Sequence, residues 1–244
     1  MIIITADDLG LTNRTTESIL RCFSKRRITT ASAMVFMADS ERAASRALDA
    51  GLEVGLHINL TLPFSDSHIS PGLRADQERS ISYLSKHKLA QIVYNPFLVA
   101  SFGAVFRAQL EEFIRLYGKP PTFYNGHHHM HLCANVILGE LIPRGSRVRR
   151  TFSVRWGDKS FFNIGYRRLL DWAVDRRFVS TDYFFSLQPL RNKDRLRKIF
   201  EQGVHNNIEI ETHPENAEEE KFLQGDEYHS LMQSVMTGTF KGLF

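Results

Sequence analysis

Apolar and polar positions along this chain follow a repeating order of strand-like and helix-like blocks. Short apolar, β-branched runs predict strands, and runs whose apolar residues recur every three to four positions predict helices. We expect strands over residues 2–6, 30–37, 53–60, 121–125, 148–154, 181–187 and 207–212. We expect helices over residues 13–25, 40–50, 102–117, 136–142, 162–175 and 192–202.

Strands that alternate with helices in this way form a parallel sheet with the helices outside it. At 244 residues, the predicted fold is a closed or slightly incomplete (β/α) barrel, and an open doubly wound sheet is the alternative. Residues 63–94 lack strong periodicity and are expected to form a long insertion over the site. No break in composition divides the chain, so we expect one domain over residues 1–244.

Composition excludes several classes of protein. The 31 basic and 27 acidic residues are mostly interspersed, which is not typical of a nucleic-acid-binding stripe. No run of eighteen apolar residues predicts a transmembrane segment. Cys22 and Cys133 are far apart, as in a chain from a reducing compartment, and residues 1–4 lead directly into acidic residues rather than into a signal peptide. We therefore expect a cytoplasmic protein.

Polar residues with metal-binding chemistry follow the predicted strands. Asp7 and Asp8, His57, the histidines of residues 127–131, and His213 each come at or near the end of a strand. The carboxyl ends of parallel strands share one edge of a sheet, so we expect these side chains to converge although they are far apart in sequence.

Asp7 and Asp8 are adjacent carboxylates at a buried strand end. Burial and mutual repulsion raise the pKa of one or both, and a divalent cation removes this cost. One carboxylate can then bind the metal while the other accepts a proton from water. A turn or a helix N-cap is the alternative for an isolated Asp pair.

Histidines occupy two further strand ends. Side-chain alternation places His57 opposite its apolar neighbours, and residues 127–131 hold four histidines in five positions. Neutral imidazole is a strong ligand of Zn²⁺ and related ions. Continued alternation would direct His127, His129 and His131 to one side. The alternatives are a hydrogen-bonded core residue for His57 and a surface patch for the cluster.

His213 and Arg149 complete the set of candidates. His213 ends the last predicted strand, where Pro214 holds it on a turn, and an unligated imidazole can give a proton to a leaving amine or alcohol. Arg149 comes at the start of another predicted strand and could form an ion pair with Asp7. A simple turn residue and a surface charge are the alternatives.

Five motifs carry a family resemblance, and they occur in order along almost the whole chain. They are TADDLGL at 5–11, ITTASAM at 28–34, GLHINLT at 55–61, GHHHMH at 126–131 and THP at 212–214. In this order they resemble the YdjC/ChbG family of carbohydrate deacetylases, which includes the hopanoid-biosynthesis deacetylase type. The chain departs from several members at Asn125, where they carry Asp.

This resemblance implies a distorted or incomplete (β/α) barrel of the glycoside hydrolase/deacetylase type. It implies a metal-dependent hydrolase that removes N-acetyl groups from a chito-oligosaccharide or a glycolipid head group, and a homodimer as the expected assembly. Asp8, His57 and His127 would bind Mg²⁺ or Zn²⁺. Asp7 would be the base, and His213 the acid or a stabiliser of the transition state.

Two other functions remain open at this point. Asp and His ligands also serve metal-dependent phosphoesterases, although the sequence has no glycine-rich phosphate loop. A sugar-binding or metal-binding relative without catalysis would keep the same barrel, but the presence of Asp7 as a base argues against that function.

Overall fold

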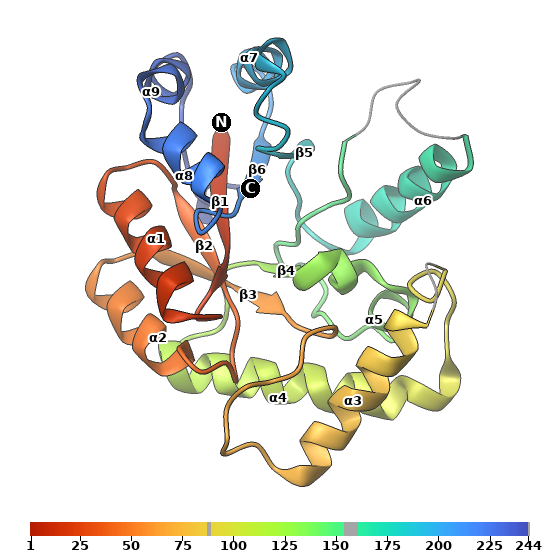
Figure 1. The fold of residues 1–244 in the computed structure, drawn as a ribbon. Helices are drawn as coiled ribbons and strands as arrows, with labels where there is room; N and C mark the ends of the chain where they lie inside the picture. Colours follow the sequence, from red (N-terminus) through yellow and green to blue (C-terminus); the bar gives the residue numbers. More distant parts are fainter. Residues whose placement is uncertain (87–88, 154–160, 244) are drawn as a thin grey trace.

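The protein was studied as a computed structural model, which describes residues 1–86, 89–153 and 161–243. Six parallel strands form one curled sheet in the order β4-β3-β2-β1-β6-β5 (Figure 1). The strands are β1 (Ile2–Leu9), β2 (Thr30–Ala33), β3 (Glu53–Ile58), β4 (Tyr124–Gly126), β5 (Tyr183–Ser186) and β6 (Ile208–Thr212). Since every pair is parallel, the carboxyl ends of the strands lie along one edge.

Helices connect the strands and lie outside the curled sheet (Figure 1). The α-helices are α1 (Asn13–Ser24), α2 (Ser40–Asp49), α3 (Pro71–Ser85), α4 (Val99–Tyr117), α5 (Ala134–Ile137), α6 (Phe161–Arg177), α7 (Lys193–Gln202), α8 (Ala217–Gln224) and α9 (Asp226–Gln233). Short 3₁₀ segments are η1 (Pro96–Leu98), η2 (His127–Leu132) and η3 (Phe240–Gly242). The predicted order of strands and helices is therefore largely confirmed.

Strand β1 occupies the middle of the sheet because it has hydrogen-bonded partners on both sides. It pairs with β2 and with β6, and all eight of its residues are buried. A strand that is covered on both faces reads as a continuous apolar run, which explains the sequence Ile2-Ile3-Ile4. Its last acidic residues are consequently buried as well.

An irregular segment closes the gap between the two edge strands, β4 and β5. On one side, the Arg149 amide donates to the carbonyl of Tyr124 at 3.0 Å. On the other side, the Ser153 amide donates to the carbonyl of Phe184 at 2.8 Å. The fold is thus a distorted (β/α) barrel, as expected, and not the open doubly wound sheet.

The strand expected over residues 148–154 is the main error in the predicted sheet. Residues 147 and 148 make only isolated bridges, to Val179 and to Tyr124, and residue 154 lies outside the described residues. The segment bonds to each edge strand at a different point, so no regular ladder forms. Val148, Arg149 and Thr151 of this segment are nevertheless buried, as expected for a part of the barrel wall.

The insertion over residues 63–94 contains the helix α3, which the periodicity did not predict. The buried side chains of α3 are Gln77, Ser80 and Leu84, so most of its inner face is polar and the apolar repeat is absent. The start signals are nevertheless present, because Ser70 caps the amide of Leu73 and Pro71 occupies the first turn.

Two further helices, α8 and α9, follow His213 where no helix was predicted. Glu218, Glu219 and Glu220 lie in the first turn of α8, where carboxylates are favoured by the helix dipole. Among the helices of the described residues, none has the combination of length and apolar character needed to cross a lipid bilayer.

Candidate metal centre and its buried carboxylates

A bulge in β1 separates the directions of the two adjacent aspartates. Ala6 pairs with Ala31 and Leu9 with Ala33, so β1 has one residue more than β2 between these pairs. Asp8 has a φ of 68°, a left-handed conformation that Asp adopts more readily than most residues. Asp7 and Asp8 can therefore contact different partners although they are consecutive.

Asp8 lies against two histidines. Its Oδ1 atom is 3.1 Å from His57 Nε2 and 3.1 Å from His127 Nδ1. One ligand atom from each of the three residues lies within 4.8 Å of the others. Burial raises the pKa of Asp8, but hydrogen bonds from the two histidines outweigh it and hold the pKa well below its ordinary value. One carboxylate and two imidazoles at this separation fit a single divalent ion.

A network behind His57 determines which of its ring nitrogens faces Asp8. Nδ1 of His57 lies 2.8 Å from Asn125 Oδ1 and 3.0 Å from Ser32 Oγ. The Asn125 carbonyl can only accept, so Nδ1 of His57 donates to it and Nε2 is left facing Asp8. Nε2 donates to Asp8 in the ring that carries both protons, and it is the atom that would bind an ion after losing its proton.

Asn125 also reaches Asp7. Its amide Nδ2 donates to Asp7 Oδ1 at 3.1 Å, and Ser32 Oγ donates to the same oxygen at 2.8 Å. A carboxylate at position 125 could accept from His57 but could not donate to Asp7. The departure at Asn125 therefore supplies a donor that links His57, a candidate metal ligand, to Asp7.

Arg149 is fully buried and bonded to three carboxylates. Its Nη1 and Nη2 atoms donate to Asp7 Oδ2 at 2.5 Å and Oδ1 at 2.9 Å, a two-pronged ion pair. Nε donates to Glu209 Oε1 at 2.8 Å, and Nη1 lies 3.2 Å from Glu211 Oε2. The guanidinium also lies 4.7 Å from the centre of the Phe184 ring. The ion pair expected between Arg149 and Asp7 is present.

One guanidinium cannot neutralise three buried carboxylates, so the pKa values of Asp7, Glu209 and Glu211 shift in different directions. Burial raises the pKa of Asp7, but Arg149 and His57 together hold it well below its ordinary value. Burial raises the pKa of Glu209, and it raises that of Glu211 to about 7, with only partial compensation from Arg149. At neutral pH we expect Asp7 to be ionised and Glu211 to hold a proton for part of the time.

The histidine cluster is a tight turn and not an extended continuation of β4. His128 and His129 have φ values of 52° and 59°, so the expected alternation of side chains is wrong. His128 Nδ1 lies 3.1 Å from Thr61 Oγ1, and the ring of His129 lies 4.5 Å from that of Phe152. The four imidazoles therefore have different surroundings, and His127 alone among them contacts Asp8 by hydrogen bond within the described residues.

His131 supports the site from inside the barrel. It is fully buried, and burial lowers its pKa to about 3, so the ring is neutral. Its Nε2 atom lies 3.0 Å from the carbonyl oxygen of Arg149 and donates to it. Together with the Arg149 amide bonded to Tyr124, this contact fixes the backbone that carries the guanidinium.

His213 lies beside the aspartates because of the register of the sheet. Ala6 pairs with Thr212, so His213 follows at the level of Asp7. The His213 amide and the Thr212 hydroxyl both donate to Oε2 of the buried Glu219, at 2.8 and 2.7 Å. Burial lowers the pKa of His213, but the negative charges of Asp7 and other carboxylates raise it above its ordinary value.

Sequence reasoning missed Ser32, Glu209 and Glu211. The two glutamates alternate with Ile208 and Ile210 in β6, and this pattern was available as a signal for two acidic side chains on one face of a strand. Ser32 had no such signal, because a serine inside a short strand is ordinary.

The fold and the site together define the class of protein. The protein is a distorted (β/α) barrel with a candidate centre for one divalent ion and a separate carboxylate that is held beside that centre by arginine. A family model described as YdjC-like protein matches residues 1–238, and the chain belongs to this family.

Curated relatives match a little over half of the chain. A carbohydrate deacetylase of Danio rerio is 28% identical over 144 residues, which are 55% of this chain and 43% of the relative. A chitooligosaccharide deacetylase of Proteus mirabilis is 29% identical over 138 residues, which are 56% of this chain and 52% of the relative. The match thus spans about half the length of these relatives.

Solved structures share the fold. A protein from Enterococcus faecalis V583 whose name suggests cellobiose-phosphate cleavage aligns with a TM-score of 0.66 and 16% identity, over 98% of this chain and 97% of that one. A mutant of a pseudoenzyme of the CE4 family aligns with a TM-score of 0.50 and 13% identity, over 100% of this chain and 66% of that one. At such identities the likeness concerns the fold alone.

Proposed function

We propose that the protein is a metal-dependent hydrolase that removes the acetyl group from an N-acetylated sugar. One observation carries the proposal: the bulge in β1 directs Asp8 to two histidines and leaves Asp7 beside them, bonded to Arg149. A metal centre next to an ionised carboxylate is the arrangement required to activate water against an amide. The names of the curated relatives support the same reaction.

Asp8, His57 and His127 would hold the ion. Zn²⁺ and Mg²⁺ are the proposed ions. A set of two imidazole nitrogens and one carboxylate oxygen favours Zn²⁺, because Mg²⁺ prefers oxygen ligands. When bound, the ion would polarise the acetyl carbonyl and stabilise the charge that develops on its oxygen.

Asp7 is the proposed base. Its bonds to Arg149, Ser32 and Asn125 keep the carboxylate ionised and fix its orientation, so it is ready to accept the proton of the attacking water. Arg149 is the proposed positioning residue, since its guanidinium is fully buried and acts on the reaction through Asp7.

His213 is the proposed acid. Its raised pKa keeps the ring protonated over a wider range of pH than a free imidazole, and the amine formed by cleavage of the amide needs a proton. The proposed carrier of the acetamide is a chito-oligosaccharide, which the names of curated relatives support, or the head group of a glycolipid. A homodimer and a cytoplasmic location remain predictions, the latter resting on two free, separated cysteines.

The test is the release of acetate from a panel of N-acetylated oligosaccharides and glycolipids, with and without a chelator. Release that stops with the chelator and returns with Zn²⁺ or Mg²⁺ supports the proposal. No release from a folded, metal-loaded protein would favour a binding protein instead. Release of phosphate from sugar phosphates, without release of acetate, would favour the phosphoesterase.

Variants separate the two aspartates. Asp7→Asn should abolish turnover while the metal content stays near that of the wild type. His57→Ala, His127→Ala and Asp8→Asn should each lower the metal content. Loss of metal in Asp7→Asn would contradict the proposed roles.

A further inference from the structure

The backbone at Phe36, shortly after the end of β2, is left-handed, with a φ of 60°. A bulky side chain disfavours this conformation, which Gly, Asn and Asp adopt more readily. The other described residues with positive φ that are not glycine lie in the candidate site or in turns after helices, and they are Asp8, His128, His129, Arg26 and Glu140. Phe36 belongs to neither group, so its conformation needs a reason of its own.

The loop of residues 59–66, which follows β3, holds Phe36 in this conformation. The Phe36 carbonyl accepts from the amides of Ser65 at 3.1 Å and Asp66 at 3.0 Å. The ring of Phe36 lies 5.1 Å from that of Phe64, which is buried. An unfavourable backbone that the surrounding structure enforces is a feature of ligand-binding positions, and the side chain of Phe36 is the part of the residue that a ligand would contact.

Phe36 lies at the edge of the barrel that carries the candidate metal centre. Ser32, which belongs to the site, precedes Phe36 by four residues, and such a segment spans at most roughly 14 Å. The loop of residues 59–66 also contacts the histidine cluster, because Thr61 Oγ1 lies 3.1 Å from His128 Nδ1. A ligand at the metal centre that is longer than one sugar ring can therefore extend to Phe36.

The surroundings of the Phe36 ring suit a sugar. Phe36 is partly exposed, and its neighbours Ser65 and Asp66 are polar and at least partly exposed. A sugar ring has C–H groups on its faces and hydroxyl groups at its edge, so it can pack on an aromatic ring while its hydroxyls contact polar groups. A purely apolar ligand would cover the same polar groups without offering them hydrogen bonds.

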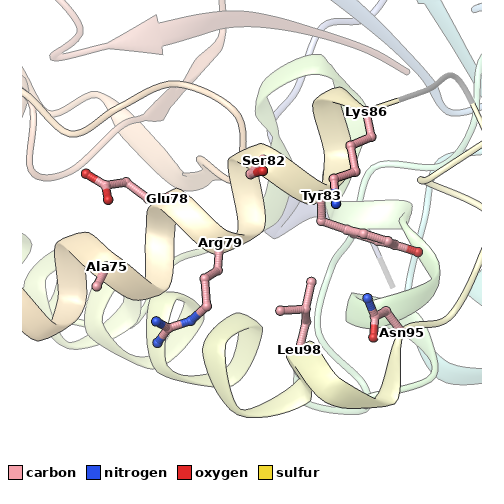
Figure 2. Close-up of a pocket in the computed structure, with 8 residues that line it drawn as sticks. All are labelled: Ala75, Glu78, Arg79, Ser82, Tyr83, Lys86, Asn95 and Leu98. Atoms are coloured by element: carbon pink, nitrogen blue, oxygen red, sulfur yellow. The ribbon is translucent and has the colours of Figure 1, made fainter.

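A groove between α3 and η1 is the alternative place for a sugar ring (Figure 2). Figure 2 shows Glu78 and Lys86 among its lining residues, so the groove has mixed charge. The hydroxyl of Tyr83, its aromatic side chain, already donates to the carbonyl of Val93 at 2.7 Å. None of the lining residues belongs to the candidate metal centre or to a strand end. Phe36 is therefore the better candidate for a contact with the substrate.

We propose that Phe36 is a specificity-determining residue, which stacks against a sugar ring next to the ring that carries the acetamide. The inference rests on the proposed deacetylase function. Among the ring contacts of the described residues, those of Phe36 include Phe64 but no histidine of the metal centre, which places the stacking beside the reacting ring and not on it. An Asn or Gly at this position would relax the backbone but would remove the stacking surface.

The experiment compares Phe36→Asn, whose side chain suits a left-handed backbone, with the wild type. The substrates are N-acetylglucosamine and its β-1,4-linked dimer and trimer, and the release of acetate is measured. KM for the dimer and trimer should rise about tenfold, because the stacking surface is lost. The kcat for these substrates should stay within about twofold of the wild type, since the reacting atoms lie elsewhere. KM for the monomer should be unchanged, and Phe36→Tyr, which keeps a ring, should retain the KM of the wild type for all three.

Binding without turnover is measured by isothermal titration calorimetry of the trimer in the Asp7→Asn background. Adding Phe36→Asn should weaken the affinity about tenfold. The matched control is Phe97→Asn, which removes a phenylalanine that is 92% exposed and adjoins the groove of Figure 2 through Leu98. This control should bind as its parent does. Phe36→Asn should also melt at a higher temperature than Phe36→Ala, because both lose the ring but Asn adopts the left-handed backbone more readily.

The outcomes separate this inference from the proposed function. If the wild type releases acetate but Phe36→Asn has unchanged KM and affinity for the trimer, or if Phe97→Asn loses as much affinity, Phe36 does not contact the substrate and the deacetylase proposal stands. An equal rise in KM for the monomer would overturn the assignment to the neighbouring ring. If no sugar yields acetate but Phe36→Asn weakens trimer binding, the deacetylase proposal fails and the contact stands. No binding of the trimer by any of the proteins overturns the inference.

Discussion

The buried carboxylates around Arg149 make the stability of the fold depend on pH, and Glu211 offers the clearest way to measure this. Its side chain is 6% exposed, and it shares Nη1 of Arg149 with Asp7, which makes the shorter contact. Burial raises the pKa of Glu211 from 4.5 to about 7. We predict that Glu211→Gln, which keeps the shape and removes the titration, becomes more stable relative to the wild type as pH rises.

The sign and the size follow from proton linkage. A carboxyl whose pKa is higher in the folded state binds more protons on folding, so its contribution is present below the unfolded pKa of 4.5 and is lost as pH rises through about 7. A change of one in pKa corresponds to about 1.4 kcal/mol, so the full effect is about 3 kcal/mol. The difference in unfolding free energy between Glu211→Gln and wild type should change by about 2 to 3 kcal/mol from about pH 5 to about pH 8.

Urea unfolding at several pH values, in the presence of a chelator so that no ion contributes, measures this difference. Glu201→Gln, at an exposed position of α7, is the control and should follow the wild type at every pH. If the curves of Glu211→Gln and wild type run parallel between about pH 5 and about pH 8, Glu211 is ionised throughout and our account of the charge balance is wrong.

Three further substitutions test the support of the site. Arg149→Met should lower the unfolding free energy by about 3 to 5 kcal/mol near neutral pH, because it leaves buried carboxylates without a cationic partner. Urea unfolding should show a smaller loss in acid, where the carboxylates are protonated. Gly126→Ala should reduce metal affinity roughly tenfold or more in a competition assay, because the added Cβ would lie 2.9 Å from the His131 backbone nitrogen and would displace the turn that begins with His127. Unchanged metal affinity would contradict this prediction. Glu219→Ala should lower kcat roughly ten- to a hundredfold with unchanged metal content, because the turn that carries His213 loses its hydrogen bonds to Glu219. The control Glu218→Ala, at an exposed position, should leave kcat unchanged, and equal effects of the two variants would refute the role of Glu219.

Local chemistry explains which elements could be predicted. The run Ile2-Ile3-Ile4 predicts a buried strand because it is short, β-branched and apolar throughout, as a strand covered on both faces is. The periodic helices α1, α2, α4 and α7 are likewise readable, since each buries one apolar face. The helix α3 could not be predicted from periodicity, because its buried face is largely polar. The closing segment near Arg149 was wrongly predicted as a strand, because it forms no regular ladder.

The sequence by itself determined the chemical inventory of the site and its convergence. Asp7, Asp8, His57 and His127 are metal-binding types at the ends of parallel strands, and the topology of such a sheet brings strand ends together. Their separate roles depend on contacts between distant segments. The bulge against β2 turns Asp8 toward the histidines, and Asp7 is held by Asn125 from β4 and by Arg149 from the irregular closing segment.

Tertiary structure alone decided the balance of charge. Nothing in the sequence pairs Arg149 with Glu209 and Glu211, because the three residues meet only when the closing segment lies between β4 and β5 and the Arg149 side chain reaches β6. Burial there raises the pKa of Glu211, whereas the charges of Arg149 and His57 outweigh burial and lower the pKa of Asp7. Such differences arise from desolvation and distance, which are properties of the folded chain.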